Sequence, residues 1–268
     1  MKKTVIILSI LVLLAGGCKP KTTSANLPTT SPQADTLNIA QATPPQETDE
    51  EKELRYQKEK QQIIDEFNAH PLVSAEEVAR IAPVIKKWTD FYKLDLAHAR
   101  LTEFLDSTYT CLDCPPDTRD VYYQEYTPEQ NTSKLISVFY SPDKQRYIDI
   151  GIFCEKINGK YYDTGEYDDC QIIKFTDRRL KHNHTLFYFG VSTGVDVVFW
   201  KNNDVFFLAG REFGYPRYFI YEYNISNRTR THYEIVADAK NSNYLTEVVY
   251  KEKRIILDYE EYEKLKAQ

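Results

Sequence analysis

The sequence has no hydrophobic run long enough to span a membrane as a helix. Its apolar stretch Thr4–Leu14 falls well short of the ~20 residues that such a helix needs. The chain also has no excess of basic residues, because 34 Lys and Arg are outnumbered by 40 Asp and Glu. A net charge of −6 gives no general attraction to nucleic acid or to anionic headgroups. We therefore expect no nucleic-acid partner.

Aromatic residues are missing from the first part of the chain. No Phe, Tyr or Trp occurs before Tyr56, and Lys19–Thr48 consists largely of Pro, Thr, Ser, Ala and Gln. A segment of this composition cannot bury enough apolar surface to offset the entropy lost on ordering. Residues 18–48 are therefore predicted to form a disordered linker, which its prolines stiffen locally.

The first residues have the three parts of an export signal. A basic start, Met1–Lys3, is followed by the short apolar stretch and by small residues, which predicts a signal peptide over residues 1–17. The sequence Ala-Gly-Gly-Cys that ends at Cys18 resembles the lipobox of bacterial lipoproteins. This resemblance implies cleavage between Gly17 and Cys18 and attachment of a diacylglycerol to the Cys18 thiol. Ordinary secretory cleavage and an uncleaved N-terminal anchor are the alternatives.

The expected lipid is a durable anchor to the cell envelope. Each buried methylene contributes about 0.8 kcal/mol, and two or more acyl chains, such as palmitate, hold a protein stably on a bilayer. Lys19 follows the cysteine, where an Asp in lipoproteins of this kind is the familiar signal for retention in the inner membrane. The resemblance therefore implies an outer-membrane lipoprotein on the periplasmic side, with the bilayer as its partner through acylated Cys18.

The rest of the chain predicts helices followed by strands. Ser74 and Glu77 form a capping box at the start of one helix, and Asn158-Gly159 is a strong signal for a type I′ hairpin turn. A second hairpin turn is expected at residues 141–144 and a tight turn at residues 202–204. Helices are expected at residues 49–68, 74–92, 95–105 and 260–266. Strands are expected at residues 136–140, 147–157, 160–162, 171–175, 185–189, 195–200, 205–209, 218–225, 231–236 and 245–257.

These elements indicate an α+β fold, with N-terminal helices and then a meandering antiparallel sheet. The alternatives are an open β-sandwich and a partial propeller, since about 130 residues of strand supply too few blades to close a ring. We expect a helical segment at residues 49–110 and an antiparallel β-rich region at residues 111–268, packed together as one domain.

Four cysteines besides Cys18 are candidates for chemistry. An even number in an exported protein favours two disulfides among Cys111, Cys114, Cys154 and Cys170, with the pairing open. Cys111 and Cys114 also have the spacing of a thiol oxidoreductase, but the pair follows a predicted helix and precedes Pro-Pro. A redox pair needs a helix start after a strand. A zinc site formed by all four cysteines is disfavoured, because two of them lack a close spacing.

Other polar residues give no complete site. His182 and His184 would share a face if they continued a strand, but a polar turn is expected there and no third metal ligand has a matching spacing. The acidic residues at 163, 166, 168 and 169 lack the alternation of a calcium loop. Ser192 lies in Gly-Val-Ser-Thr-Gly, but strands are expected on both sides of it, whereas a hydrolase elbow leads from a strand into a helix. The sequence thus predicts no catalytic residue, metal or cofactor.

The stretches YSPDKQRYIDI and VVFWKNNDVFFLAG loosely resemble exported lipoproteins of Gram-negative bacteria, a resemblance that implies no activity. The leading hypothesis is a membrane-anchored, non-enzymatic binding or structural module with a protein or glycan partner. One alternative is a periplasmic enzyme, either a hydrolase that uses carboxylates or an oxidoreductase that uses Cys111 and Cys114. Another is an immunity-type or inhibitor lipoprotein.

Overall fold

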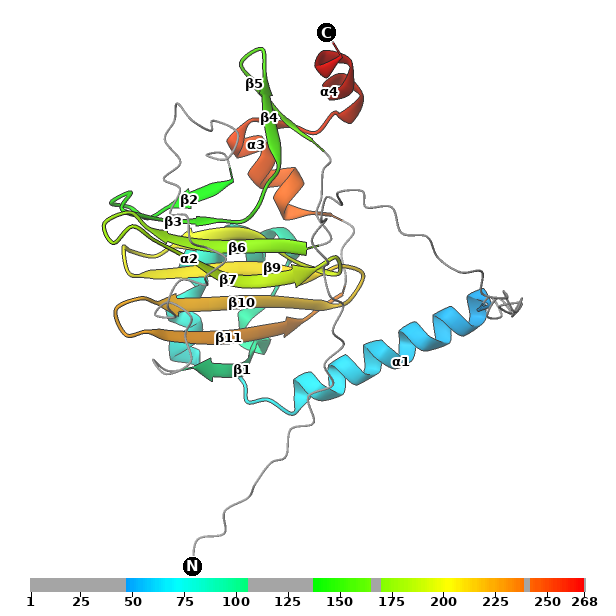
Figure 1. The fold of residues 1–268 in the computed structure, drawn as a ribbon. Coiled ribbons are helices and arrows are strands. Elements are labelled where there is room, and N and C mark those ends of the chain that lie inside the picture. Colours follow the sequence, from blue (N-terminus) through cyan, green and yellow to red (C-terminus); the bar gives the residue numbers. More distant parts are fainter. Residues whose placement is uncertain (1–46, 106–136, 165–169, 239–241, 268) are drawn as a thin grey trace, which may run out of the picture. The chain divides into compact units, whose positions relative to one another are not determined.

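The computed structural model describes residues 47–105, 137–164, 170–238 and 242–267 (Figure 1). These residues all belong to the second of two units, Glu47–Gln268, into which the chain divides. The fold is α+β, as predicted, with helices first and open antiparallel sheets after them. The helical elements are α1 (Asp49–Asn68), α2 (Ala75–Tyr92), the 3₁₀-helix η1 (Leu96–His98), the π-helix η4 (Leu245–Val249), α3 (Tyr250–Lys253) and α4 (Tyr259–Lys266).

The strands form three sheets. A five-stranded antiparallel sheet has the order β1-β11-β10-β9-β8, and a four-stranded antiparallel sheet has the order β2-β3-β6-β7. In the third sheet, β12-β5-β4, the short β12 pairs parallel to β5. The strands are β1 (Arg100–Leu105), β2 (Val138–Tyr140), β3 (Arg146–Asp149), β4 (Cys154–Ile157), β5 (Lys160–Asp163), β6 (Cys170–Asp177), β7 (His182–Gly190), β8 (Thr193–Trp200), β9 (Val205–Glu212), β10 (Arg217–Asn224), β11 (Thr229–Val236) and β12 (Ile255–Ile256).

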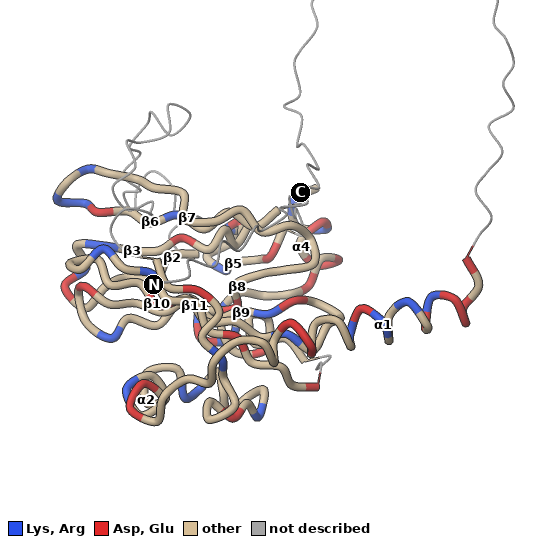
Figure 2. The backbone as a smooth tube through the Cα atoms, turned by 90° about the horizontal axis from the view of Figure 1, so that it is seen from below, with Lys and Arg blue, Asp and Glu red and all other residues tan. Residues whose placement is uncertain are grey.

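Both long helices begin with a capping box. In α2 the Ser74 hydroxyl accepts a hydrogen bond from the Glu77 amide, and the Glu77 carboxylate accepts one from the Ser74 amide, as the sequence predicts. Thr48 and Glu51 make the same exchange at the start of α1. Helix α1 buries only Ile63 and Phe67, and acidic and basic residues are interspersed along it (Figure 2). Its amino-terminal part is therefore held by capping and side-chain pairs rather than by packing.

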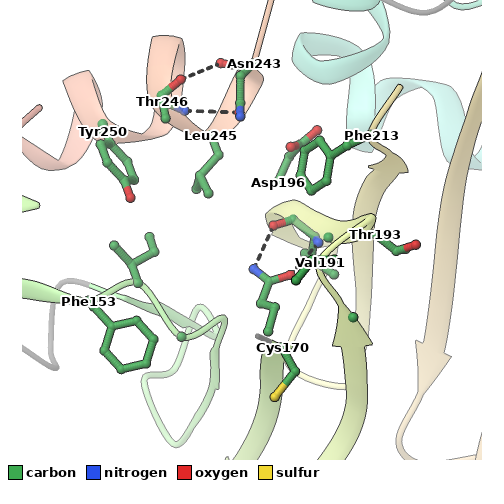
Figure 3. Close-up of a pocket in the computed structure, with 16 residues that line it drawn as sticks. Phe153, Cys170, Val191, Thr193, Asp196, Phe213, Asn243, Leu245, Thr246 and Tyr250 are labelled. Carbon is green, nitrogen blue, oxygen red and sulfur yellow. Dashed lines mark hydrogen bonds between the residues drawn. The ribbon is translucent and has the colours of Figure 1, made fainter. Parts of the chain in front are cut away.

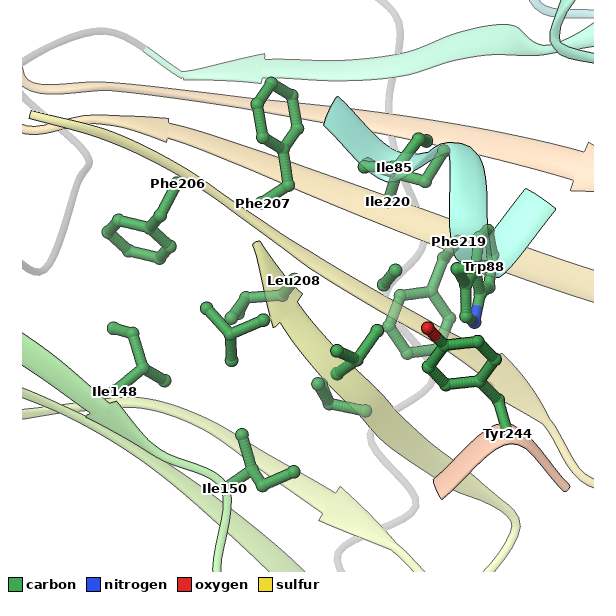
Figure 4. Close-up of a cluster of buried hydrophobic side chains, with 14 of the residues drawn as sticks. Ile85, Trp88, Ile148, Ile150, Phe206, Phe207, Leu208, Phe219, Ile220 and Tyr244 are labelled. Atoms are coloured by element: carbon green, nitrogen blue, oxygen red, sulfur yellow. The ribbon is translucent and has the colours of Figure 1, made fainter. Parts of the chain in front are cut away.

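The five-stranded sheet is the middle layer of the domain. Alternate residues of a strand point to opposite faces, and those of β10 contact different layers. On one face, Tyr218 lies with its ring centroid 6.0 Å from that of Trp88 in α2. On the other face, Tyr221 lies 4.4 Å from Phe187 of β7. Helix α2 thus covers one face and the four-stranded sheet covers the other, with the apolar core on both sides of the middle sheet (Figure 4).

The predicted turns are present. Asn158 and Gly159 have φ angles of 51° and 81°, and a type I′ turn requires a positive φ at both positions. The turn at residues 141–144 connects β2 to β3, and the Asn202 side chain accepts hydrogen bonds from the amides of Asp204 and Val205 in the next tight turn. Glycine and asparagine thus occur where the backbone needs a conformation that most residues avoid.

Four local predictions are wrong. Residues 95–105 contain only the short η1, and residues 100–105 form the edge strand β1 because they pair with β11. Residues 245–257 are largely helical, because they form η4 and α3 and pack Val249 and Tyr250 into the core where these two helices meet. The single strand expected at 147–157 is divided into β3 and β4, and Gly151 between them has a φ of 68°. The residues expected in a turn at 182–184 begin β7.

The helical and β-rich regions form one unit, but the boundary expected at residue 110 is misplaced because β1 is already part of the five-stranded sheet. Within the described residues, no helix is both long and apolar enough to cross a membrane.

Candidate functional site

A cavity of about 300 Å³ lies between strand ends and the helical segment formed by η4 and α3 (Figure 3). Five separate parts of the chain line it: the β3–β4 connection, the start of β6, the β7–β8 turn with the start of β8, the residue after β9, and the η4–α3 segment. Leu245 and Tyr250 point from the helical segment towards the space, opposite Phe153 (Figure 3). The described lining residues are Gly151, Ile152, Phe153, Cys170, Gln171, Gly190, Val191, Thr193, Gly194, Val195, Asp196, Phe213, Asn243, Leu245, Thr246 and Tyr250.

The Gln171 side chain fixes one wall of the cavity. Its amide nitrogen donates to the carbonyl oxygens of Ile150 (2.9 Å) and Val195 (3.1 Å), and its oxygen accepts from the Val195 amide (2.7 Å). The end of β3, the start of β6 and the start of β8 are therefore tied together by one side chain. Gly194 is packed against this link, since a Cβ there would lie 3.2 Å from Gln171 Oε1 and 3.3 Å from the Phe213 ring.

Apolar side chains surround the mouth of the cavity. Val191 is 75% exposed, Phe153 is 40% exposed and Phe213 is 39% exposed, and all three line the same space. Single exposed apolar residues are common on protein surfaces, whereas a group of them around a concave site is typical of a binding surface. The lining is mainly apolar with a few polar groups, which is the usual character of a small-molecule site.

Asp196 lies at the edge of the cavity and is almost completely buried, with 1% of its surface exposed. The pairing of β8 with β9 shifts register between Val195 and Val197, so Asp196 occupies a β-bulge. A bulge can redirect a side chain, and here the Asp196 carboxylate bonds to α2. Its Oδ2 accepts hydrogen bonds from Trp88 Nε1 and Tyr92 Oη, both at 3.0 Å.

Burial raises the pKa of Asp196 to about 6, against the opposing effects of Trp88, the Arg211 guanidinium and Tyr92. The Tyr92 hydroxyl also accepts a hydrogen bond from the Tyr244 amide at 2.9 Å. Asp196 therefore connects β8, α2 and the segment that precedes η4. Asp196 is not among the site residues predicted from the sequence, although a lone Asp within the apolar stretch Val-Asp-Val-Val-Phe is a signal for it.

A second, open cleft of about 400 Å³ lies beside α2 and contains a pair of carboxylates, Glu77 and Glu222. Tyr233 Oη lies between them, 3.1 Å from Glu222 and 3.4 Å from Glu77. Glu222 also receives two hydrogen bonds from the Arg80 guanidinium, one of them at 2.7 Å. A bidentate arginine stabilises the ionised carboxylate, whereas a glycosidase acid must keep its proton. This pair therefore gives no support to a carboxylate hydrolase.

The aromatic rings do not form a sugar-binding face in the described residues. The main cluster lies between the two larger sheets, where Phe187 and Phe189 of β7 pack against Phe219 and Tyr221 of β10. These rings are cross-layer core contacts. On the outer side of β7, Tyr188 is exposed.

The predicted cysteine sites are only partly described. Cys154 is a free thiol in the structure. The prediction that all four cysteines form disulfides is therefore wrong for Cys154. Its side chain packs into the apolar core, where burial and the charge of Asp163 raise the pKa of the thiol to about 12. Cys170 begins β6 and lines the cavity. Gly17, Cys18, Cys111 and Cys114 lie outside the described residues.

No group of three or more His, Cys, Asp or Glu side chains within the described ranges could hold a metal ion. His182 and His184 have ring centroids 5.8 Å apart, but His184 is buried and stacks on Phe175. Asp163 is buried at the end of β5. The other residues of the predicted acidic loop, at 166, 168 and 169, lie outside the described residues.

Comparison of the chain with protein-family models, with curated proteins and with solved structures gives no match.

Proposed function

We propose that the protein is a lipid-anchored binding protein of the cell envelope, held in the outer membrane on its periplasmic side, whose cavity binds a small ligand. The lipobox-like sequence before Cys18 supports the anchor, and the Pro- and Thr-rich linker supports a domain held away from the membrane. The observation that carries the binding role is the cavity of about 300 Å³ with exposed apolar side chains at its mouth.

The cavity favours binding over catalysis. Its described lining contains no histidine and no serine, and therefore neither a Ser–His nor a Cys–His pair. Its carboxylate, Asp196, makes hydrogen bonds to α2 and not to another group of the lining. A general base must reach the proton that it removes from a substrate. The two groups that contact Asp196 Oδ2 are instead side chains of α2.

The anchor is tested by metabolic labelling with radioactive palmitate. The wild-type protein should incorporate label, and Cys18→Ser should remove the label and leave the precursor unprocessed. Cys154→Ser is the matched control and should retain normal labelling, because its thiol lies in the folded core. Labelling of Cys18→Ser at the wild-type level would contradict the lipoprotein assignment.

The binding role is tested by analysis of the protein purified from cells. Solvent extraction and mass spectrometry should detect a small molecule with the wild type, in an amount comparable to the protein. Leu245→Trp places a larger side chain in the cavity and should remove that molecule. Leu180→Trp is the control, since Leu180 is 64% exposed in the β6–β7 turn and does not line the cavity. Equal amounts in both variants, or none in the wild type, would contradict a ligand in this cavity.

A further inference from the structure

We infer that the cavity binds an uncharged amphiphile with a single hydrocarbon chain and a hydroxyl group at its polar end. This inference rests on the proposed function, because it names the chemical class of the ligand for the same cavity. Three observations carry it: the absence of an available charge in the described lining, the position of the polar groups, and the size and apolar character of the remaining space.

The charge of the lining excludes an ionic ligand. None of the lining residues in the described ranges is Lys, Arg or His, so a buried anion would have no cationic partner. Asp196 would repel an anion, and it offers little to a cation, because its carboxylate already binds Trp88 and Tyr92 and is attracted by Arg211. Burial of an unpaired charge is strongly unfavourable. A neutral ligand is the one that this lining accommodates.

Asn243 and Thr246 lie next to each other in the cavity lining and supply polar groups able to bind a ligand (Figure 3). The Gln171 side-chain amide is already hydrogen-bonded to backbone groups of Ile150 and Val195. Asn243 accepts a hydrogen bond from the Thr246 amide through Oδ1, and the Thr246 hydroxyl donates to the Asn243 carbonyl. Among the described residues, the Asn243 side-chain nitrogen has no acceptor, and Thr246 Oγ1 can still accept a hydrogen bond. A ligand hydroxyl could accept from Asn243 and donate to Thr246, with both groups satisfied.

The rest of the space suits a hydrocarbon chain. Leu245 and Tyr250 face Phe153 across it, and Val191 and Phe213 continue the apolar lining to the mouth (Figure 3). A volume of about 300 Å³ is at the lower limit for small-molecule pockets, so one chain fits better than a branched or fused-ring ligand. Each methylene that enters the cavity should tighten binding about fourfold until the space is filled.

The test uses dissolved single-chain amphiphiles that differ either in chain length or in the charge of the polar end. Hexanol, octanol and decanol vary the chain, while decanoate and decylammonium replace the hydroxyl of decanol by a negative and a positive charge. Isothermal titration calorimetry gives the affinities. We expect octanol to bind about 16-fold more tightly than hexanol, which is the effect of two methylenes. Decanol should bind at least tenfold more tightly than either charged analogue.

Four variants, one of them a control, locate the binding. Leu245→Trp should abolish binding of the alcohols, and the control Leu180→Trp should leave it unchanged. Asn243→Ala should weaken alcohol binding about fivefold to tenfold, the usual effect of one lost hydrogen bond. Val191→Lys adds a charge at a position that is 75% exposed, so it should not disturb folding. It should weaken decanol and strengthen decanoate.

The possible failures are distinct. Tighter binding of decanoate or decylammonium than of decanol would overturn the inference and leave the proposed binding role intact. Alcohol binding that is unaffected by Leu245→Trp and by Val191→Lys would also overturn it, because the alcohols would then bind elsewhere. If no probe binds and no molecule copurifies with the wild type, the proposed function itself fails.

Discussion

Asp196→Asn should make the protein more stable relative to the wild type as the pH rises. The pKa of Asp196 is about 6 in the folded protein, above its ordinary value of 3.8, because the carboxyl group is buried. In the unfolded chain the group ionises near its ordinary pKa, so folding favours the protonated form. The stability that this preference contributes is fully present below about pH 4 and is lost as the pH rises through about 6.

The shift from 3.8 to about 6 corresponds to roughly 3 kcal/mol. Asparagine cannot titrate, and its oxygen can still accept the hydrogen bonds from Trp88 and Tyr92. Urea unfolding of both proteins between pH 3.5 and pH 7.5 should therefore show the variant gaining about 3 kcal/mol on the wild type across this range. Because the two proteins share all other titratable groups, the difference between their unfolding free energies reports the titration of Asp196 alone. A difference that is independent of pH, or that changes in the opposite direction, would refute the reasoning.

Three further predictions concern packing and charge. Gly210→Ala should destabilise the fold by about 3 kcal/mol in urea unfolding, because its Cβ would lie 2.2 Å from a backbone oxygen. The control Gly190→Ala should change the stability by less than about 1 kcal/mol, because its Cβ would have no atom within 4 Å. The Cys154 thiol should resist iodoacetamide at pH 8 in the native protein and react after unfolding, as peptide mapping would detect, because burial keeps it protonated. Arg80→Ala should cost about 1–3 kcal/mol by leaving the buried Glu222 without its cationic partner, and adding Glu222→Gln should restore part of that loss. Equal unfolding of the two glycine variants, native alkylation of Cys154, or no rescue by Glu222→Gln would contradict these expectations.

The parts of the fold that could be predicted from the sequence have local causes. Asn158-Gly159 determines its hairpin because few other residues adopt a positive φ, and the capping box at Ser74 depends on residues three apart. Residues 100–105 form a strand only because β11 lies beside them, a contact that no local pattern contains. Residues 245–253 have the Val and Tyr content of a strand, yet they form the helices η4 and α3, from which Val249 and Tyr250 pack into the core.

The candidate site was largely beyond prediction. Its lining comes from five parts of the chain, and their meeting depends on the stacking of the two larger sheets and on the Gln171 hydrogen bonds. Asp196 was not predicted as a site residue, because the β-bulge that turns it towards α2 has no recognisable sequence pattern. The predicted anchor at Cys18 is local and needs no tertiary structure, so it stays a prediction for the labelling experiment.

The most direct test of the account is native mass spectrometry of the wild type and of Leu245→Trp, each purified from cells in a mild detergent. We expect the wild type to carry an additional mass equal to one small neutral molecule other than the detergent, and Leu245→Trp to lack it while Leu180→Trp keeps it. An additional mass that Leu245→Trp retains, or a wild type that carries none, would contradict the claim that this cavity is the binding site.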